Sequence, residues 1–382
     1  MNNKMVQIIV SCQDYIKDYD CVKRMGNIKY RLPMIDSYVV EVNEEQLEEM
    51  IENKVVTGYE LDAHITAQIR RASDEIEVEW AHKRNIYGEG IGVAIVDTGI
   101  CKHEDFMSDK SRVVAFYDVV NKRKKAYDDN GHGSHVAGII GGNARASRGK
   151  YRGIAPKCDL IGVKVLNNKG DGNVSDVLAG LQWIIDNKKR YNIRIVNISV
   201  GATSKNEIDE NSMLVKGVDA VWDAGIIVVV AAGNNGPDPM SISTPGISRK
   251  VITVGSSDDN YTVDLFGSKK KDYSGRGPTQ SCIKKPDVVA PGSSIVSCGI
   301  ASGRSNRGEK NRPSGYSKVY TVKSGTSMST PIVSGAIALL LSKYPKMNNR
   351  DVKLKLRNGT VDLGYPWTKQ GWGLVNIPKL LS

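Results

Sequence analysis

The feature that most constrains the fold of this chain is a set of five short apolar runs without polar alternation. They are GVAIVD (92–97), DLIGVKVL (159–166), RIVNISV (194–200), GIIVVVAAG (225–233) and VITVGS (251–256). Strands that are apolar on both faces are typical of a parallel sheet covered by helices. Helical patterns lie between these runs, namely HGSHVAGIIGG, VSDVLAGLQWIIDNKK and SMLVKGVDAVWDAG. This alternation predicts an α/β sandwich around a mainly parallel sheet.

The first sixty residues follow a different pattern and predict a separate small α+β module. β-branched residues mark three predicted strands, VQIIVSC (6–12), SYVVEV (37–42) and KVVTGYEL (54–61). Residues 43–53, NEEQLEEMIEN, predict a helix with Asn43 as its N-cap. The strands resemble antiparallel partners more than parallel ones. The polar stretch 61–80 is predicted to join the module to the larger domain.

Composition limits the classes of function. The chain has 382 residues with 40% hydrophobic content, which is ample for a large core. Its net charge is +11, but the basic residues are scattered. The densest basic runs, 121–125 and 267–278, are flanked by turn formers, so we predict solvated loops and no nucleic-acid partner. The six cysteines form no CxxC pair, which favours isolated reduced thiols.

The sequence carries no sign of a membrane segment or a signal peptide. The first fifteen residues contain only a five-residue mixed apolar run, and no run of eighteen apolar residues occurs. We therefore expect a cytoplasmic protein without membrane contact, and export by another route stays open. The stretch 299–318, rich in Gly, Ser and Arg, predicts an exposed loop. The glycines of YGEGIGVAIVD precede a strand instead of following it, which argues against a phosphate-binding loop.

Four polar residues stand where a site is expected in a parallel sheet, just after a strand or at a helix start. They are Asp97, His132, Asn234 and Ser327. Each alone has a structural explanation, as a turn former, a buried structural histidine or an N-cap. The pair His132 and His135 also suggests a metal site, but HExxH or further Cys and His partners are missing.

Ser327 lies in SGTSMSTP, in front of the apolar helix pattern IVSGAIALLL. A helix start presents unpaired N–H groups and a positive dipole end, which suits developing negative charge. Pro331 has no N–H, so the carbonyl of Ser327 loses its usual i+4 donor. The order Asp, His, Asn, Ser matches one of the arrangements in which the Ser-His-Asp triad has evolved.

At this point the chain resembles the subtilisin-like serine proteases, the subtilase family (peptidase S8). The matching stretches lie between residues 76 and 342 and are VAIVDTGI, NGHGSHVAGII, RIVNISVG, VVVAAGNNG, KPDVVAPG and SGTSMSTPIVSGAIALL. The resemblance implies a subtilisin-like three-layer sandwich around a mainly parallel sheet. It also implies a ferredoxin-like α+β propeptide. The expected domains are residues 1–66 for the prodomain and 67–382 for the catalytic domain.

The resemblance assigns roles to the four polar residues. Ser327 matches the nucleophile, His132 the general base, and Asp97 the acid that orients the imidazole. Asn234 matches the oxyanion-hole amide, which acts together with the backbone N–H of Ser327. His135 matches a residue that is structural in the family.

The resemblance also implies a cleft that holds an extended peptide by strand pairing. One side and the S1 wall would be Ser199, Val200 and Gly201, the second wall Ala231, Ala232 and Gly233, and the opposite edge Gly170, Asp171, Gly172 and Asn173. These walls place no charge opposite S1. We therefore expect a broad, mainly apolar S1 preference.

The implied function is a serine endopeptidase that is made as a self-processing zymogen. Its partners would be peptide or protein substrates and its own propeptide, an intramolecular inhibitor whose tail, GYELDAHITAQ, plugs the cleft. Self-cleavage is expected near residues 64–67, and the enzyme is expected to be a monomer. Two alternatives stay open: a permanent accessory domain at the N-terminus, and a catalytically silent subtilase scaffold that binds peptides or partners.

The chain departs from the family in a loop where secreted subtilases bind calcium. Here that loop is NARASRGKYRG (143–153), whose four basic residues would repel Ca²⁺. We therefore expect no metal in this loop and no required cofactor, while a different weak ion site stays open. Cys101 follows Asp97 by four residues and is expected to be a packed, inert thiol.

Overall fold

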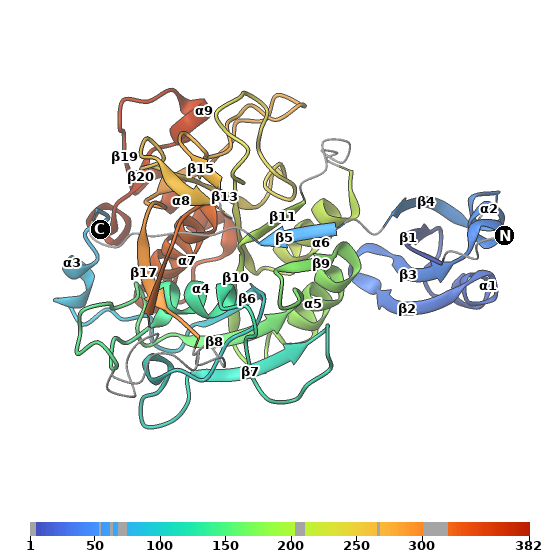
Figure 1. Ribbon diagram of the computed structural model, residues 1–382, viewed down its shortest axis with the longest axis horizontal. Helices are drawn as coiled ribbons and strands as arrows, with labels where there is room; N and C mark the ends of the chain where they lie inside the picture. Colours follow the sequence, from blue (N-terminus) through green and yellow to red (C-terminus); the bar gives the residue numbers. More distant parts are fainter. Residues whose placement is uncertain are drawn as a thin grey trace, which may run out of the picture.

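The computed structural model describes residues 5–52, 55–61, 64–67, 75–202, 211–265, 268–300 and 320–382. In these ranges the chain forms a large α/β domain with a smaller N-terminal module at one end (Figure 1). Apart from residues 299 and 300, the predicted loop 299–318 lies outside the described residues.

The N-terminal module has the element order βαββαβ, which is that of ferredoxin-like folds. Its elements are β1 (Val6–Cys12), α1 (Tyr19–Met25), β2 (Asn27–Leu32), β3 (Ser37–Val42), α2 (Glu44–Glu52) and β4 (Val56–Leu61). The strand order is β2-β3-β1-β4, and every neighbouring pair is antiparallel. The predicted N-cap is confirmed, because Asn43 Oδ1 accepts a hydrogen bond from the backbone N–H of Gln46 at 2.9 Å.

The central strands of this module are apolar on both faces for a physical reason. Ile8 and Val40 pack on one side with residues of α1 and α2, such as Val22 and Met50. Ile9, Leu32 and Val39 point the other way and belong to the core of the large domain. The module therefore buries both faces of its sheet, one against its own helices and one against the larger domain.

Within the described residues, nine strands form the central sheet of the large domain. The order is β19-β20-β16-β13-β12-β10-β6-β8-β7, and all neighbours are parallel except β19 and β20. The bounds are β6 (Gly92–Asp97), β7 (Val113–Asp118), β8 (Asp159–Lys164), β10 (Ile193–Ile198), β12 (Ile227–Ala231), β13 (Ile252–Ser256), β16 (Val288–Ala290), β19 (Thr360–Val361) and β20 (Leu374–Val375). All five apolar runs are strands of this sheet, which confirms the predicted fold class.

Helices cover both faces of the sheet. On one face α4 (His132–Gly141) contacts β6, and α7 (Thr326–Lys343) contacts β10, β12 and α4. On the other face α5 (Val174–Asn187) and α6 (Met213–Asp223) pack on each other and on the sheet. The remaining described helices are α3 (Glu79–His82), α8 (Asn349–Asn358), α9 (Trp367–Gln370) and α10 (Ile377–Leu381). No helix in the described ranges has the length and apolar character needed to cross a membrane.

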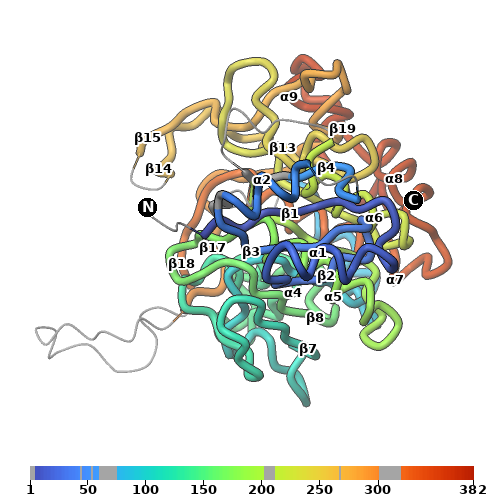
Figure 2. Tube along the Cα trace, turned by 90° about the vertical axis from the view of Figure 1, so that its right-hand side faces the viewer, coloured from blue at the N-terminus to red at the C-terminus, as the bar shows by residue number. Residues whose placement is uncertain are grey.

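The N-terminal module rests on the layer formed by α5 and α6, as the end-on view in Figure 2 shows. The hydroxyl of Tyr30 donates to Asp176 Oδ1 in the first turn of α5 at 2.7 Å. The backbone N–H of Met34 donates to Gln182 Oε1 at 2.9 Å. These two bonds connect the module to the first and third turns of one helix and fix its position along α5.

Replacing Tyr30 by Phe is expected to loosen this contact. The change removes an O–H donor from a carboxylate that is otherwise bonded at longer range, to Asn173 at 3.4 Å and Lys29 at 3.8 Å. A hydrogen bond to a charged group contributes about 1.5–3 kcal/mol. Hydrogen exchange should accelerate in β2 and in the first turn of α5. The exposed Tyr59 gives the control Tyr59→Phe, and equal exchange in both variants would contradict the assignment.

Candidate active site

The site lies at the carboxyl ends of three neighbouring parallel strands. Val96 of β6 is opposite Ile198 of β10, and Ile198 is opposite Val230 of β12. The next residue of each strand therefore continues the same row, one interstrand spacing of about 4.8 Å from its neighbour. This register brings Asp97 beside Ser199, at the edge of the sheet where open α/β folds place their ligands.

Asp97 and His132 form a buried, directly bonded pair. His132 Nδ1 lies 2.7 Å and 2.8 Å from the two carboxylate oxygens of Asp97, and neither side chain is measurably exposed to solvent. A carboxylate can only accept, so Nδ1 carries the proton and Nε2 is the basic nitrogen of the neutral ring. The backbone N–H of Thr98 also donates to Asp97 Oδ1, at 2.7 Å. The arrangement fixes both the tautomer and the orientation of the imidazole.

The glycines around His132 permit this close approach. Gly131 caps α4 with φ of 96°, a left-handed conformation that favours glycine. A Cβ at Gly133 would lie 2.2 Å from the carbonyl oxygen of Gly99, so only glycine fits there. The sequence GHG thus allows the first turn of α4 to press against the turn that follows Asp97.

Asp128 organises the start of α4, and the sequence analysis assigned it no role. Its carboxylate accepts from the backbone N–H of Gly131 at 2.8 Å and from both the N–H and the hydroxyl of Ser134 at 2.9 Å and 2.7 Å. It also accepts from Thr98 Oγ1 at 3.0 Å, and that oxygen in turn accepts from the N–H of Gly133. One carboxylate therefore ties the turn after Asp97 to the helix that carries His132. An acid shortly before a helix start was the available signal.

A buried lysine stabilises the backbone next to the same edge of the sheet. Lys164, at the end of β8, is fully buried. Its ammonium donates to the carbonyls of Thr98 and Leu166 at 2.6 Å and 2.8 Å and to Asp129 at 2.7 Å. These contacts pair the charge and hold the residue after Asp97 in place.

Ser327 lies in the first turn of α7, next to the end of β10. Its hydroxyl donates to the carbonyl of Ser199 at 2.9 Å, and the hydroxyl of Ser199 donates back to the carbonyl of Ser327 at 3.0 Å. The second bond compensates for Pro331. Proline has no N–H to donate to the carbonyl of Ser327, and the hydroxyl of Ser199 donates to that carbonyl instead. Since Ser199 stands beside Asp97, Ser327 is brought to the same edge of the sheet as the Asp97–His132 pair.

Asn234 presents an unpaired donor at this edge. Its Oδ1 accepts from the N–H and the hydroxyl of Thr326, both at 3.0 Å, which fixes the direction of the amide. Its Nδ2 is buried and has no hydrogen-bond partner among the described residues. A buried donor without a partner costs about 1–3 kcal/mol, so its presence beside Ser327 asks for a functional explanation.

An extended segment of the chain itself occupies the groove in front of this edge. β5 (His64–Ala67) is antiparallel to both β9 (Asp171–Asn173) and β11 (Val200–Ala202), in the order β11-β5-β9. The two flanking strands contain residues predicted as cleft walls, from Asp171 to Asn173 and Val200 to Gly201. The third predicted wall, Ala231 to Gly233, lies at the end of β12, where Ala232 O accepts from the N–H of Ser243 at 2.8 Å.

His135 is separate from this chemistry. It is fully buried, and its Nε2 lies 3.2 Å from the carbonyls of both Ile295 and Thr321. Burial lowers its pKa well below the ordinary value, so the ring is neutral and Nε2–H is the donor. The residue holds β17 (Ile295–Cys298) and β18 (Tyr320–Lys323) against α4.

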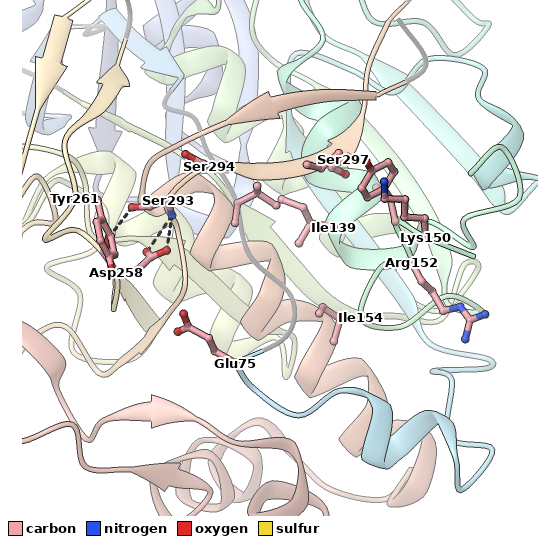
Figure 3. Close-up of a pocket in the computed structure, with 14 residues that line it drawn as sticks. Glu75, Ile139, Lys150, Arg152, Ile154, Asp258, Tyr261, Ser293, Ser294 and Ser297 are labelled. Atoms are coloured by element: carbon pink, nitrogen blue, oxygen red, sulfur yellow. Dashed lines mark hydrogen bonds between the residues drawn. The ribbon is translucent and has the colours of Figure 1, made fainter. Parts of the chain in front are cut away.

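A cavity of about 630 Å³ lies elsewhere, beside the later turns of α4 (Figure 3). Glu75 and Asp258 stand on one side and Lys150 and Arg152 on another. Burial and the charge of Asp258 raise the pKa of Glu75. Asp258 itself accepts from two backbone N–H groups of the turn before β17, those of Gly292 and Ser293. The acidic wall thus supports the local fold, and none of the four predicted catalytic residues lines this cavity.

Comparison with known proteins agrees with this geometry. The Subtilase family model (Peptidase_S8) matches residues 88–373. Serine protease AprX of Bacillus subtilis is 42% identical over 285 residues, covering 72% of this chain and 62% of AprX, so this chain spans less than two thirds of that relative. The thermostable alkaline protease of Halalkalibacterium halodurans is 30% identical over 372 residues, covering 97% of this chain and 88% of the relative. The alkaline protease of Shouchella clausii is 30% identical over 340 residues, covering 88% and 77%. The chain, with its mainly parallel sheet and a family match over most of its length, belongs to the subtilase family of subtilisin-like serine proteases.

Proposed function

We propose that this protein is a serine endopeptidase that hydrolyses peptide bonds with Ser327 as the nucleophile. The observation that supports this best is the buried Asp97–His132 pair, at the sheet edge where Ser199 binds Ser327 and Asn234 offers an unpaired amide donor. Each group has the chemical character that its role in acyl transfer requires.

The proposed reaction uses only side chains and backbone groups of the chain. The Ser327 hydroxyl exchanges its bond to Ser199 for one to His132 Nε2, which removes the proton as Oγ bonds to the carbonyl carbon. Asp97 stabilises the imidazolium that forms. The imidazolium then protonates the amine as the C–N bond breaks, which leaves an acyl-enzyme. A water molecule, deprotonated by the same imidazole, releases the acid and restores Ser327.

The oxyanion would be bound by two donors that already face the groove. One is Nδ2 of Asn234, whose direction is fixed by the two bonds from Thr326. The other is the backbone N–H of Ser327, which lies in the first turn of α7 and so has no helical acceptor four residues earlier. Both donors are buried, where a charge-assisted hydrogen bond is stronger than in water.

Substrates would bind as β5 does, as an extended strand between β9 and β11. Hydrogen bonds on both edges would hold the peptide backbone independently of its sequence. Specificity would then come from the substrate side chains and the pockets that receive them. The N-terminal module and β5 together would act as an intramolecular inhibitor, because β5 fills the groove that a substrate must enter. A broad, mainly apolar S1 preference fits the uncharged residues Ser199 to Gly201 and Ala231 to Gly233.

We propose that no cofactor takes part. The loop after α4, residues 143–153, carries four basic residues that would repel Ca²⁺. It closes on Asp105 through protein donors. Asp105 Oδ1 accepts from the N–H of Ala146 at 2.8 Å, and Oδ2 accepts from the hydroxyl of Tyr320 at 2.7 Å.

The register of β5 predicts which bond is cut during self-processing. Ala67, the last described residue of β5, is opposite Val200, which follows Ser199 in the chain. Ser199 is bonded to Ser327, so we expect the cut to follow Ala67 instead of falling inside β5. The sequence-based boundary near residues 64–67 stays a prediction, and this register favours its C-terminal end.

Purified wild-type protein should therefore appear as two fragments, and the larger one should begin shortly after Ala67. Ser327→Ala should remain one intact chain. Intact mass spectrometry and N-terminal sequencing distinguish the outcomes. An uncut wild type that also fails to cleave an unfolded protein substrate would favour the alternative, a catalytically silent subtilase scaffold that binds peptides. A cut at another bond would leave the activity standing but reject the register argument.

Replacing Asn234 by Leu tests the oxyanion donor. The side-chain volume is kept and the NH₂ group is lost, so kcat should fall by about 10²–10³, the loss known for subtilisin, with little change in KM. Circular dichroism must show a folded protein, since Thr326 also loses its acceptor. An unchanged kcat would remove Asn234 from the mechanism.

Replacing Asp128 by Asn tests a positioning residue. The amide would turn one NH₂ group toward donors of Thr98, Gly131 or Ser134, which loosens the start of α4 and the orientation of His132. We expect kcat to fall by about 10–100-fold, as for other residues that orient a catalytic group, with KM nearly unchanged. Asp109→Asn, on an exposed loop, is the matched control. Equal kinetics for the two variants would contradict the role.

A further inference from the structure

A second cluster of reactive side chains lies on the other side of α4, outside the proposed catalytic site. His103 caps the 3₁₀ turn η2 (Glu104–Phe106), Asp105 lies within that turn, and Cys298 ends β17. The exposed fractions of the three residues are 7%, 0% and 1%. Their ligand atoms, one from each residue, all lie within 4.8 Å of one another. The loop after β6 and the strand β17 meet here, although they are almost two hundred residues apart in sequence.

The distances within the cluster fit a tetrahedral metal site. Cys298 Sγ lies 3.5 Å from His103 Nδ1 and 3.8 Å from Asp105 Oδ2, and Nδ1 lies 3.9 Å from Asp105 Oδ1. A Zn²⁺ ion with bonds of about 2.0–2.3 Å to N, O and S ligands would separate these atoms by roughly 3.4–3.6 Å. The distance from Sγ to Nδ1 already matches this separation. The carboxylate of Asp105 must turn to bring one oxygen close to both other atoms, which starts from a set that lies within 4.8 Å.

The chemical state of the ligands also suits such an ion. His103 Nδ1 accepts from the backbone N–H of Asp105 at 3.0 Å, so Nδ1 is the unprotonated nitrogen of the ring. A metal ion at Nδ1 would take over this lone pair and displace the bond from the Asp105 N–H. Binding would replace the thiol proton, which leaves as H⁺, by an S–metal bond. A divalent ion with one thiolate, one carboxylate and one neutral imidazole has no net charge, which lowers the cost of burial. The sulfur and nitrogen donors favour zinc-class ions over Ca²⁺.

The surroundings leave one direction of approach. A Cβ at Gly138 would lie only 2.7 Å from Cys298 Sγ, so α4 covers the sulfur closely. On the other side the half-buried Tyr320 donates to Asp105 Oδ2, packs edge-on against His103 and lies tilted against Tyr151, with 4.9 Å between those two ring centroids. Access to the cluster from solvent would require Tyr320 to move, and water would then be the expected fourth ligand.

We propose that His103, Asp105 and Cys298 form a binding site for a thiophilic divalent cation of the zinc class. Its role is structural: the ion links the loop after β6 to β17 across α4, the helix that begins with His132. The site is independent of the proposed peptidase reaction and needs no oxidant or reductant.

The test uses full-length Ser327→Ala protein, treated with a chelator, so that self-cleavage does not interfere. Titration with Co²⁺ should give sulfur-to-metal charge-transfer absorption and intense visible bands of tetrahedral cobalt, saturating at one equivalent. Zn²⁺ should displace the cobalt and raise Tm with increasing concentration. Ca²⁺ should not displace it. Absence of these bands at one equivalent overturns the proposal, whatever the variants do.

Variants then assign the ligands. Cys298→Ser and His103→Gln should each weaken metal binding by about 100-fold or more, and Cys298→Ser should abolish the charge-transfer band. Cys158→Ala removes another fully buried thiol that packs against α4, at Gly141, and should bind cobalt as the parent does. Bands that persist in Cys298→Ser, or that disappear in Cys158→Ala, would place the metal elsewhere and reject this site.

Discussion

A single row across the parallel sheet, formed by Val96, Ile198 and Val230, determines where the reactive groups of this protein lie. The residues that follow this row leave the sheet at one edge, and the starts of α4 and α7 face the same edge. Side chains alternate between the faces of a strand, so a slip of one residue between β6 and β10 would turn Asp97 away from His132. The apolar pattern that buries both faces of these strands is thus also what fixes the geometry of the site.

The polar groups around this edge are paired with few exceptions, and the pairing is reciprocal. Ser199 and Ser327 exchange two bonds, which compensates for the donor that Pro331 lacks. Asp128 accepts several donors at the start of α4 and so fixes the turn that carries His132. Among the described residues a few buried polar atoms lack a partner, including Ser324 Oγ, Ser329 Oγ and Nδ2 of Asn234. Asn234 differs from the two hydroxyls because its donor is fixed in direction by the bonds from Thr326, where the proposed reaction would develop negative charge.

Much of this could be predicted from the sequence, because the signals were local. The runs that became β6, β8, β10, β12 and β13 are apolar throughout, and their ends mark the site. The module was predicted with gaps: α1 has seven residues and buries only Val22 and Met25, too few for a helical period to be visible. β2 does alternate, with Ile28, Tyr30 and Leu32 less exposed than their neighbours, so NIKYRL carried a strand signal that the prediction did not use. The partnership of Ser199 with Ser327, and of Cys298 with His103, depends on contacts between distant segments, which no local pattern encodes.

The three-stranded arrangement of β11, β5 and β9 has a consequence for target selection. A bound segment has both of its backbone edges occupied, and it must be extended over at least the four residues of β5. In a folded protein, few segments have both edges free at once, since strands are paired and helices satisfy their own backbone. Under the proposed function, substrates would therefore be chain stretches that are locally unfolded, and the conformational freedom of a target would govern its lifetime more than its side-chain sequence does.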